Sequence, residues 1–126
     1  MDALRTALGR LSLLYALVFL FFALMHAGIA FGPVGEPVIV PAAIVETLCA
    51  AAMLTGAYGV LAGRAWAWDG LIYSHAAALA GVLLGILSLA LGPGPESAPL
   101  GWYHSVMAVA LAAGLTGAFY VSRVRR

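Results

Sequence analysis

Long apolar runs dominate the chain, separated by short connections rich in polar residues, proline or glycine. The runs cover approximately residues 11–31, 41–63, 66–91 and 102–121. An α-helix needs roughly 20 apolar residues to cross the hydrocarbon layer of a membrane, and each run reaches that length. The pattern therefore predicts a single domain over residues 1–126. Its fold class is all-α, an integral membrane bundle of four antiparallel transmembrane helices.

Composition supports this class and excludes others. Hydrophobic residues make up 64% of the chain and charged residues 9%, whereas a soluble domain is about half apolar and a quarter charged. Cys49 is the single cysteine, so the chain has no intrachain disulfide and no CxxC redox motif. The net charge is +1 and lysine is absent, so no basic stripe for nucleic acid is expected.

The basic residues have a one-sided distribution. All six are arginines, and they lie in the N-terminal tail, the second connection and the C-terminal tail: Arg5, Arg10, Arg64, Arg123, Arg125 and Arg126. The first connection, residues 32–40, and the third, residues 92–101, contain none. Cytoplasmic loops carry an excess of positive charge. We therefore predict a multi-pass protein of the cell (inner) membrane with cytoplasmic N- and C-termini.

The first apolar run is flanked by a charged N-terminal segment and by a Gly-Pro pair. The run from residue 11 to 31 is longer than the apolar region of a signal peptide, so we predict a true span. Residues 1–10 are predicted to form an amphipathic lead-in at the lipid headgroups. Gly32-Pro33 is predicted to end the first helix, because proline cannot continue the backbone hydrogen-bond ladder.

Small residues recur at four-residue spacing in the last three runs, a pattern typical of close helix packing in membranes. They are Ala52, Gly56, Gly59 and Gly63 in the second run, Ala77, Gly81 and Gly85 in the third, and Ala110, Gly114 and Ala118 in the fourth. Tight packing explains these seams without a function.

Three ionisable residues fall at similar predicted depths in three different runs. His26 and Glu46 each lie roughly 8 Å below the outer end of their helix, and His104 roughly 5 Å below its own. A carboxylate in an apolar run must be protonated, paired or bound to a cation. We therefore predict that the three side chains line one outer-leaflet pocket.

This triad suits several kinds of ligand. Two imidazoles and a carboxylate fit a transition metal such as Fe, Cu or Zn. Two histidines on different helices at similar depth are also suited to hold the iron of a haem b from both sides. A quinone-type ligand or a proton relay is the third alternative. The prediction rests on depth alone, because the chain has no HxxxH or ExxH motif. The competing interpretation is structural, with Glu46 protonated or paired with a histidine to hold helices together and His26 bonded to a backbone carbonyl one turn back.

The third histidine lies elsewhere. His75 is roughly 24 Å from the outer end of its helix, so it belongs to the inner half of the membrane. There we predict a secondary polar cluster of His75 with Asp69 and Tyr73. Cys49 lies one turn after Glu46, where it either lines the same pocket or packs as a small buried residue.

About half of the chain resembles the DoxX-like group of small four-helix bacterial membrane proteins. The resemblance rests on Arg10-Leu11 near the start of the first helix, Glu46 in the second, and the run from Gly59 to Arg64 before the third. It implies quinone chemistry or partnership with membrane redox enzymes. His26 and His104 have no counterpart in that pattern, so the resemblance implies no metal or haem there.

The leading functional hypothesis is a redox-associated membrane subunit that binds a metal, haem or quinone-type ligand at His26, Glu46 and His104. One alternative is an accessory or assembly subunit without chemistry, and another is an oligomeric proton-coupled transporter. The lipid bilayer is the predicted surrounding. A larger respiratory or redox membrane complex and a second copy of the chain are the candidate partners. The sequence assigns no catalytic residue and leaves open whether the protein is an enzyme.

Overall fold

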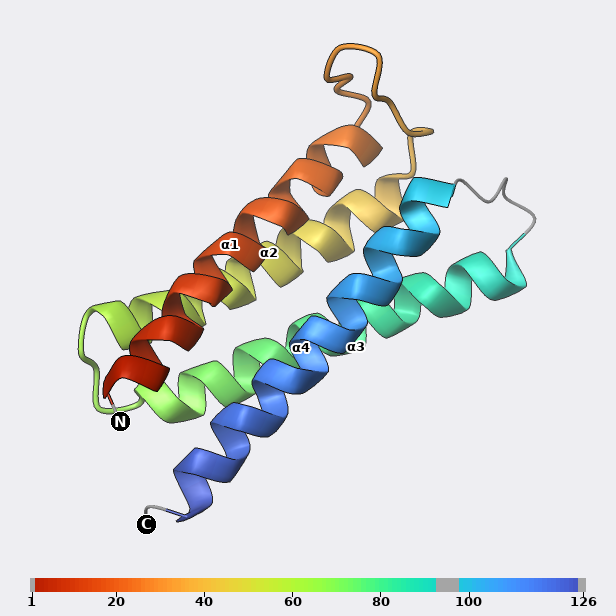
Figure 1. Ribbon diagram of the computed structural model, residues 1–126. Helices are drawn as coiled ribbons and strands as arrows, with labels where there is room; N and C mark the ends of the chain where they lie inside the picture. Colours follow the sequence, from red (N-terminus) through yellow and green to blue (C-terminus); the bar gives the residue numbers. More distant parts are fainter. Residues whose placement is uncertain (1, 93–97, 125–126) are drawn as a thin grey trace.

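The computed structural model describes residues 2–92 and 98–124, and nearly all of them lie in helices or their short connections (Figure 1). The helices are α1 (Asp2–His26), α2 (Val40–Leu61), α3 (Ala67–Leu91) and α4 (Ala98–Val124). All four are long and apolar enough to cross a membrane. At 1.5 Å per residue they measure about 33–40 Å, against roughly 30 Å of hydrocarbon. The all-α prediction with four such helices is confirmed.

Neighbouring helices in the sequence are also neighbours in space. α1 packs along α2, α2 along α3 and α3 along α4, while α1 touches α3 and α4 at only a few places. Within the described residues the backbones of α2 and α4 do not approach each other closely. The start of α1 and the end of α4 lie toward the same end of the bundle (Figure 1). The bundle is therefore closely packed along α1–α2, α2–α3 and α3–α4, and loosely packed where α1 faces α3 and α4.

The outer surfaces of the helices are apolar. Large hydrophobic side chains more than half exposed occur on every helix, among them Leu17, Leu48, Leu84 and Val109. In water such a surface would favour association or aggregation. In a bilayer it is the surface that faces the lipid tails, so the exposed side chains fit a multi-pass membrane protein.

The end of α1 differs from the prediction. The helix stops at His26, not near Phe31, because Gly28 adopts a φ of 96°. The Ile29 N–H donates to the Leu24 carbonyl (3.0 Å) and the Gly28 N–H to the Met25 carbonyl (2.9 Å). These two bonds form the Schellman ending that a left-handed glycine permits. His26 therefore sits at the rim of the helix, where its side chain can reach the start of α2.

The start of α1 also differs from the prediction. Residues 1–10 were expected to lie apart from the span as a lead-in, but the described part of this segment, from Asp2 onward, is continuous with α1. Leu8 within it is buried against Val60 and Leu71. An amphipathic segment can extend a helix as easily as it can lie on the membrane surface, and packing against α2 and α3 decides here.

The connection between α1 and α2 returns tightly onto α1. The Ile39 N–H donates to the His26 carbonyl at 2.9 Å, so the end of one helix is tied to the residue before the next. Pro41 then occupies the first turn of α2, where its missing N–H removes no helical bond. This tie fixes the relative position of His26 and the first two turns of α2.

Two groups of buried side chains form the core. The larger group lies between all four helices and includes Phe19, Met53, Ala78, Val82 and Leu111. The smaller group lies near the α2–α3 connection and comprises Leu8, Val60, Ala67, Leu71 and Ala118. The larger group separates the region around His26 from that around His75.

Candidate functional site

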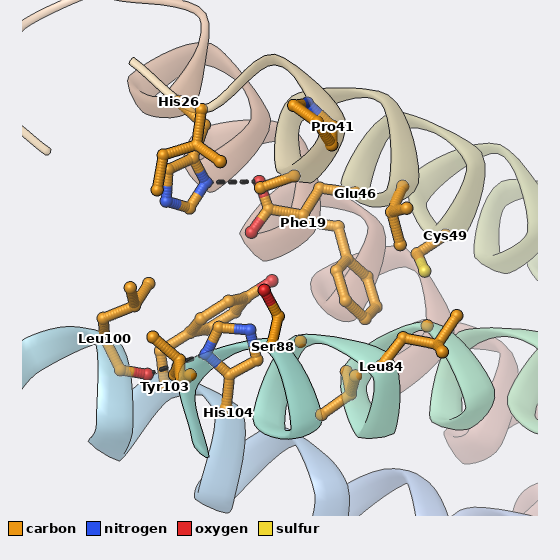
Figure 2. Close-up of a pocket in the computed structure, with 17 residues that line it drawn as sticks. Phe19, His26, Pro41, Glu46, Cys49, Leu84, Ser88, Leu100, Tyr103 and His104 are labelled. Atoms are coloured by element: carbon orange, nitrogen blue, oxygen red, sulfur yellow. Dashed lines mark hydrogen bonds and ion pairs between the residues drawn. The ribbon is translucent and has the colours of Figure 1, made fainter. Parts of the chain in front are cut away.

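A cavity of about 240 Å³ lies in the half of the bundle that contains the α1–α2 connection (Figure 2). All four helices contribute to its walls, which are mostly apolar. Four of its lining residues are also exposed on the outside of the bundle: Ile39, Pro41, Leu84 and Ser88. The cavity therefore reaches the surface between the start of α2 and the second half of α3, on the side that would face lipid.

A buried acid–base pair forms one wall. His26 Nδ1 lies 2.8 Å from Glu46 Oε2, and the exposed fractions of the two residues are 1% and 5%. The remaining polar atom of each, His26 Nε2 and Glu46 Oε1, is buried without a hydrogen-bond partner among the described residues. Unpaired buried polar atoms cost free energy. Two such atoms on adjacent side chains beside a cavity indicate a place for a polar ligand group or water.

The number of protons on this pair determines which hydrogen bonds it can make to a ligand. A net neutral pair, whether written as carboxylate with imidazolium or as carboxylic acid with imidazole, holds two titratable protons. One proton occupies the His26–Glu46 hydrogen bond. The second resides on either Glu46 Oε1 or His26 Nε2. The pair therefore presents one donor and one acceptor in every neutral form, and it can take a proton at one atom and release it at the other.

Tyr103 of α4 belongs to the same site. Its ring stacks on Phe22 with a centroid separation of 3.7 Å and meets Phe19 edge to face. The hydroxyl is buried without a hydrogen-bond partner among the described residues, and it points toward the Glu46 carboxylate (Figure 2). Tyr103 thus bridges α4 to α1 and adds a third unpaired polar atom to the cavity.

His104 lies on the opposite wall from the pair (Figure 2). Its Nδ1–H donates to the Leu100 carbonyl at 2.8 Å, and its ring rests against the bare backbone of Gly85. It hydrogen-bonds neither His26 nor Glu46. The structure therefore brings the predicted triad around one cavity, with His26 and Glu46 in direct contact and His104 across from them.

The metal alternative finds no match in this geometry. Within residues 2–92 and 98–124, no three His, Cys, Asp or Glu side chains are grouped so as to hold a metal ion. One oxygen of Glu46, Oε2, is hydrogen-bonded to His26 Nδ1. Cys49 lines the cavity as well, with its thiol 3.9 Å from the Ala78 carbonyl.

The predicted inner cluster of Asp69, Tyr73 and His75 does not assemble around the histidine. His75 is fully buried, and its Nδ1–H donates to the Leu71 carbonyl at 2.8 Å. Tyr73 is 73% exposed and faces away from the bundle, and Asp69 is exposed near the start of α3. The neighbours of His75 are instead the ring of Tyr15, edge to face, and the backbone of Gly114.

Sequence reasoning missed Tyr103 as a site residue, because Trp102-Tyr103 reads as a pair of interfacial aromatics. In the structure Trp102 is exposed and Tyr103 is buried. The pattern that groups Tyr103 with His104 becomes visible only in the structure: Tyr103 precedes His104, and Ser74 precedes His75, at the same distance after a buried leucine. The two helices share this buried pattern, so the position before each histidine faces inward.

Comparisons with known proteins returned nothing: no protein-family model, curated protein or solved structure matches this chain. The DoxX-like resemblance stays a prediction.

Proposed function

We propose that this protein binds a small, lipid-soluble ring compound with hydrogen-bonding substituents, a quinone-type head group, in the cavity between His26–Glu46 and His104. The observation that carries the proposal is the buried His26–Glu46 pair, which presents two unpartnered polar atoms at the wall of an apolar cavity. Ligand sites are typically apolar with a few convergent polar groups, and intramembrane ionisable residues most often serve a function.

The size and opening of the cavity favour this ligand class. A volume of about 240 Å³ is below the 300–1,000 Å³ or so of sites that enclose a whole drug-sized molecule. It suits a single substituted ring better than a haem macrocycle. Because the cavity reaches the surface beside Leu84, which is 59% exposed, an apolar tail on the ligand would pass between α2 and α3 into the lipid.

The placement in the membrane follows from charge. We propose an up-and-down, antiparallel path with both termini in the cytoplasm, since Arg64 and the arginines of the two tails then share one side. The cavity then lies in the outer leaflet of the inner membrane. There it would serve a redox-associated membrane subunit that exchanges ligand with the bilayer, alone or within a larger respiratory complex.

The core beneath the cavity favours ligand binding over transport. Phe19, Met53 and Leu111 are fully buried between the cavity and His75. An apolar layer of this kind offers no hydrogen-bonded route for a proton between the two halves of the bundle. The proton-coupled transporter is therefore the weaker alternative, and a subunit without any ligand is the remaining one.

The test is chemical analysis of the protein purified in mild detergent. We expect an organic extract to contain a quinone-type compound at near-stoichiometric amounts, with no Soret band and no bound transition metal. Glu46→Gln should lose the extracted compound, and the matched variant His75→Gln, which alters a buried histidine outside the cavity, should retain it. Equal content in wild type and Glu46→Gln, or a bound metal removed by that substitution, would contradict the proposal.

A further inference from the structure

α3 and α4 present matching buried faces to each other. On α3 the pattern is Leu71, Ser74, His75, Ala78 and Val82, and on α4 it is Leu100, Tyr103, His104, Met107 and Leu111, at identical spacing. Each histidine donates from Nδ1 to the carbonyl of the leucine one turn earlier. Each ring also rests against a glycine of the opposite helix, His104 on Gly85 and His75 on Gly114.

These glycines hold the histidine rings in place. A Cβ at Gly85 would overlap the His104 ring, with Cδ2 at 2.6 Å, and a Cβ at Gly114 would overlap the His75 ring in the same way, also with Cδ2 at 2.6 Å. Contacts this short force a neighbour to move. The position of the His104 ring in the cavity wall therefore depends on the absence of a side chain at Gly85.

The Leu100 hydrogen bond fixes where the proton of a neutral His104 resides. A backbone carbonyl only accepts, so Nδ1 carries the hydrogen. In the neutral imidazole Nε2 then bears the lone pair and acts as an acceptor. Figure 2 shows Nε2 on the cavity side of the ring. The ligand group that faces His104 must therefore be a donor.

The wall formed by His26 and Glu46 does not require a particular hydrogen-bonding group on the ligand. The His26–Glu46 pair always presents one donor and one acceptor, so it accommodates either a hydroxyl or a carbonyl. His104 is thus the group that distinguishes between them. A ring with a hydroxyl toward His104 can donate to Nε2, whereas a ring that carries only carbonyl oxygens offers this nitrogen no hydrogen, which weakens binding.

We infer that the cavity selects the reduced, hydroxyl-bearing form of its ring ligand, with His104 as the selecting acceptor and Gly85 as the residue that positions it. This inference rests on the proposed function, and it names the ligand as a hydroquinone-class compound.

The experiment compares two probes of the same size, tetramethylhydroquinone and tetramethylbenzoquinone. Each is titrated anaerobically into the detergent-purified protein after detergent exchange has removed the compound that it carries, at about pH 8, where an ordinary imidazole is neutral. We expect the wild type to bind the hydroquinone at least about tenfold more tightly. His104→Leu, which keeps the bulk and removes the acceptor, should reduce that ratio to near one. Gly85→Ala should reduce it as well, and the matched variant Gly114→Ala should leave it unchanged.

The possible outcomes separate the two proposals. Binding of neither probe would overturn the proposed function together with this inference. Equal affinity for the two probes, or tighter binding of the benzoquinone, would overturn the inference and leave the proposed function standing. A selective wild type whose ratio survives in His104→Leu would assign the selectivity to another residue and also overturn the inference.

Discussion

The two buried histidines of α3 and α4 have the same local structure and different surroundings. His75 and His104 are each anchored through Nδ1 to a leucine carbonyl and seated on a glycine. Around His104 the bundle leaves a cavity with Glu46 and His26 on its far wall. Around His75 the Tyr15 ring covers the imidazole, and its Nε2 is buried without a partner among the described residues.

The difference comes from α1 and α2, not from the histidine-bearing helices. At the end of the bundle that holds His104, α1 ends at His26 and α2 begins with Pro41, so the polar pair replaces apolar packing there. Around His75, α1 continues past Tyr15 and its ring occupies the space beside the imidazole. An imidazole in a membrane helix is thus insufficient to identify a site, and the space beside its free nitrogen distinguishes a ligand site from a packing position.

The largest expected effect on stability is at the His26–Glu46 pair. Glu46→Leu leaves His26 buried without its partner, and we expect a loss of about 3 kcal/mol in the free energy of unfolding. The double variant Glu46→Leu with His26→Leu should recover much of that loss, because no unpaired polar group then remains. Chemical unfolding in mixed micelles measures all three proteins. Additive losses in the double variant would show that the two side chains are not coupled.

The next largest effect is expected where α2 and α3 approach each other closely, at Gly56. A Cβ at Gly56 would lie 2.9 Å from Ser74 Cβ and 3.2 Å from the Gly70 carbonyl. We expect Gly56→Ala to cost about 2 kcal/mol through overpacking. Gly117→Ala is the matched control, since nothing lies within 4 Å of its Cβ position, and its stability should equal or exceed the wild type. The reverse order in the same unfolding assay would contradict the described packing.

The smallest effect on stability is expected at His75. His75→Leu exchanges one hydrogen bond and one unpaired buried nitrogen for apolar contacts, so the two changes nearly cancel. We expect a shift below about 1 kcal/mol in unfolding free energy, with ligand content unchanged. A loss of stability as large as that of Glu46→Leu, or loss of the ligand, would show that His75 is more than a packing residue.

Hydropathy and helix length were sufficient to predict the four helices, because lipid-spanning segments need long apolar runs whatever their tertiary contacts. Depth along the helices also placed His26, Glu46 and His104 around one pocket, although it did not predict that His26 and Glu46 would pair, and the predicted end of the first helix was too late. Gly28 supplies the helix ending, and Gly32-Pro33 only shapes the connection. Gly28, two residues after His26, was the overlooked signal.

The remaining features depend on how helices rotate about their axes, which one sequence does not reveal. Tyr103 faces the cavity and Tyr73 faces outward, although both are tyrosines near histidines. Their orientation is set by the contact of Gly85 and Gly114 with the two imidazoles across the α3–α4 interface. The sequence identified these glycines as sites of close packing but not the rings that occupy the space.

The most direct test is whether ligand enters the cavity at His26, Glu46 and His104 while the surroundings of His75 stay closed. It uses the three histidines as reporters. Protein labelled with ¹⁵N in histidine gives one pair of ring signals for each of His26, His75 and His104, which single substitutions assign. On addition of tetramethylhydroquinone, we expect the Nε2 signals of His26 and His104 to shift and both ring signals of His75 to stay in place. A shift at His75, or unchanged signals at both outer histidines, would contradict the account.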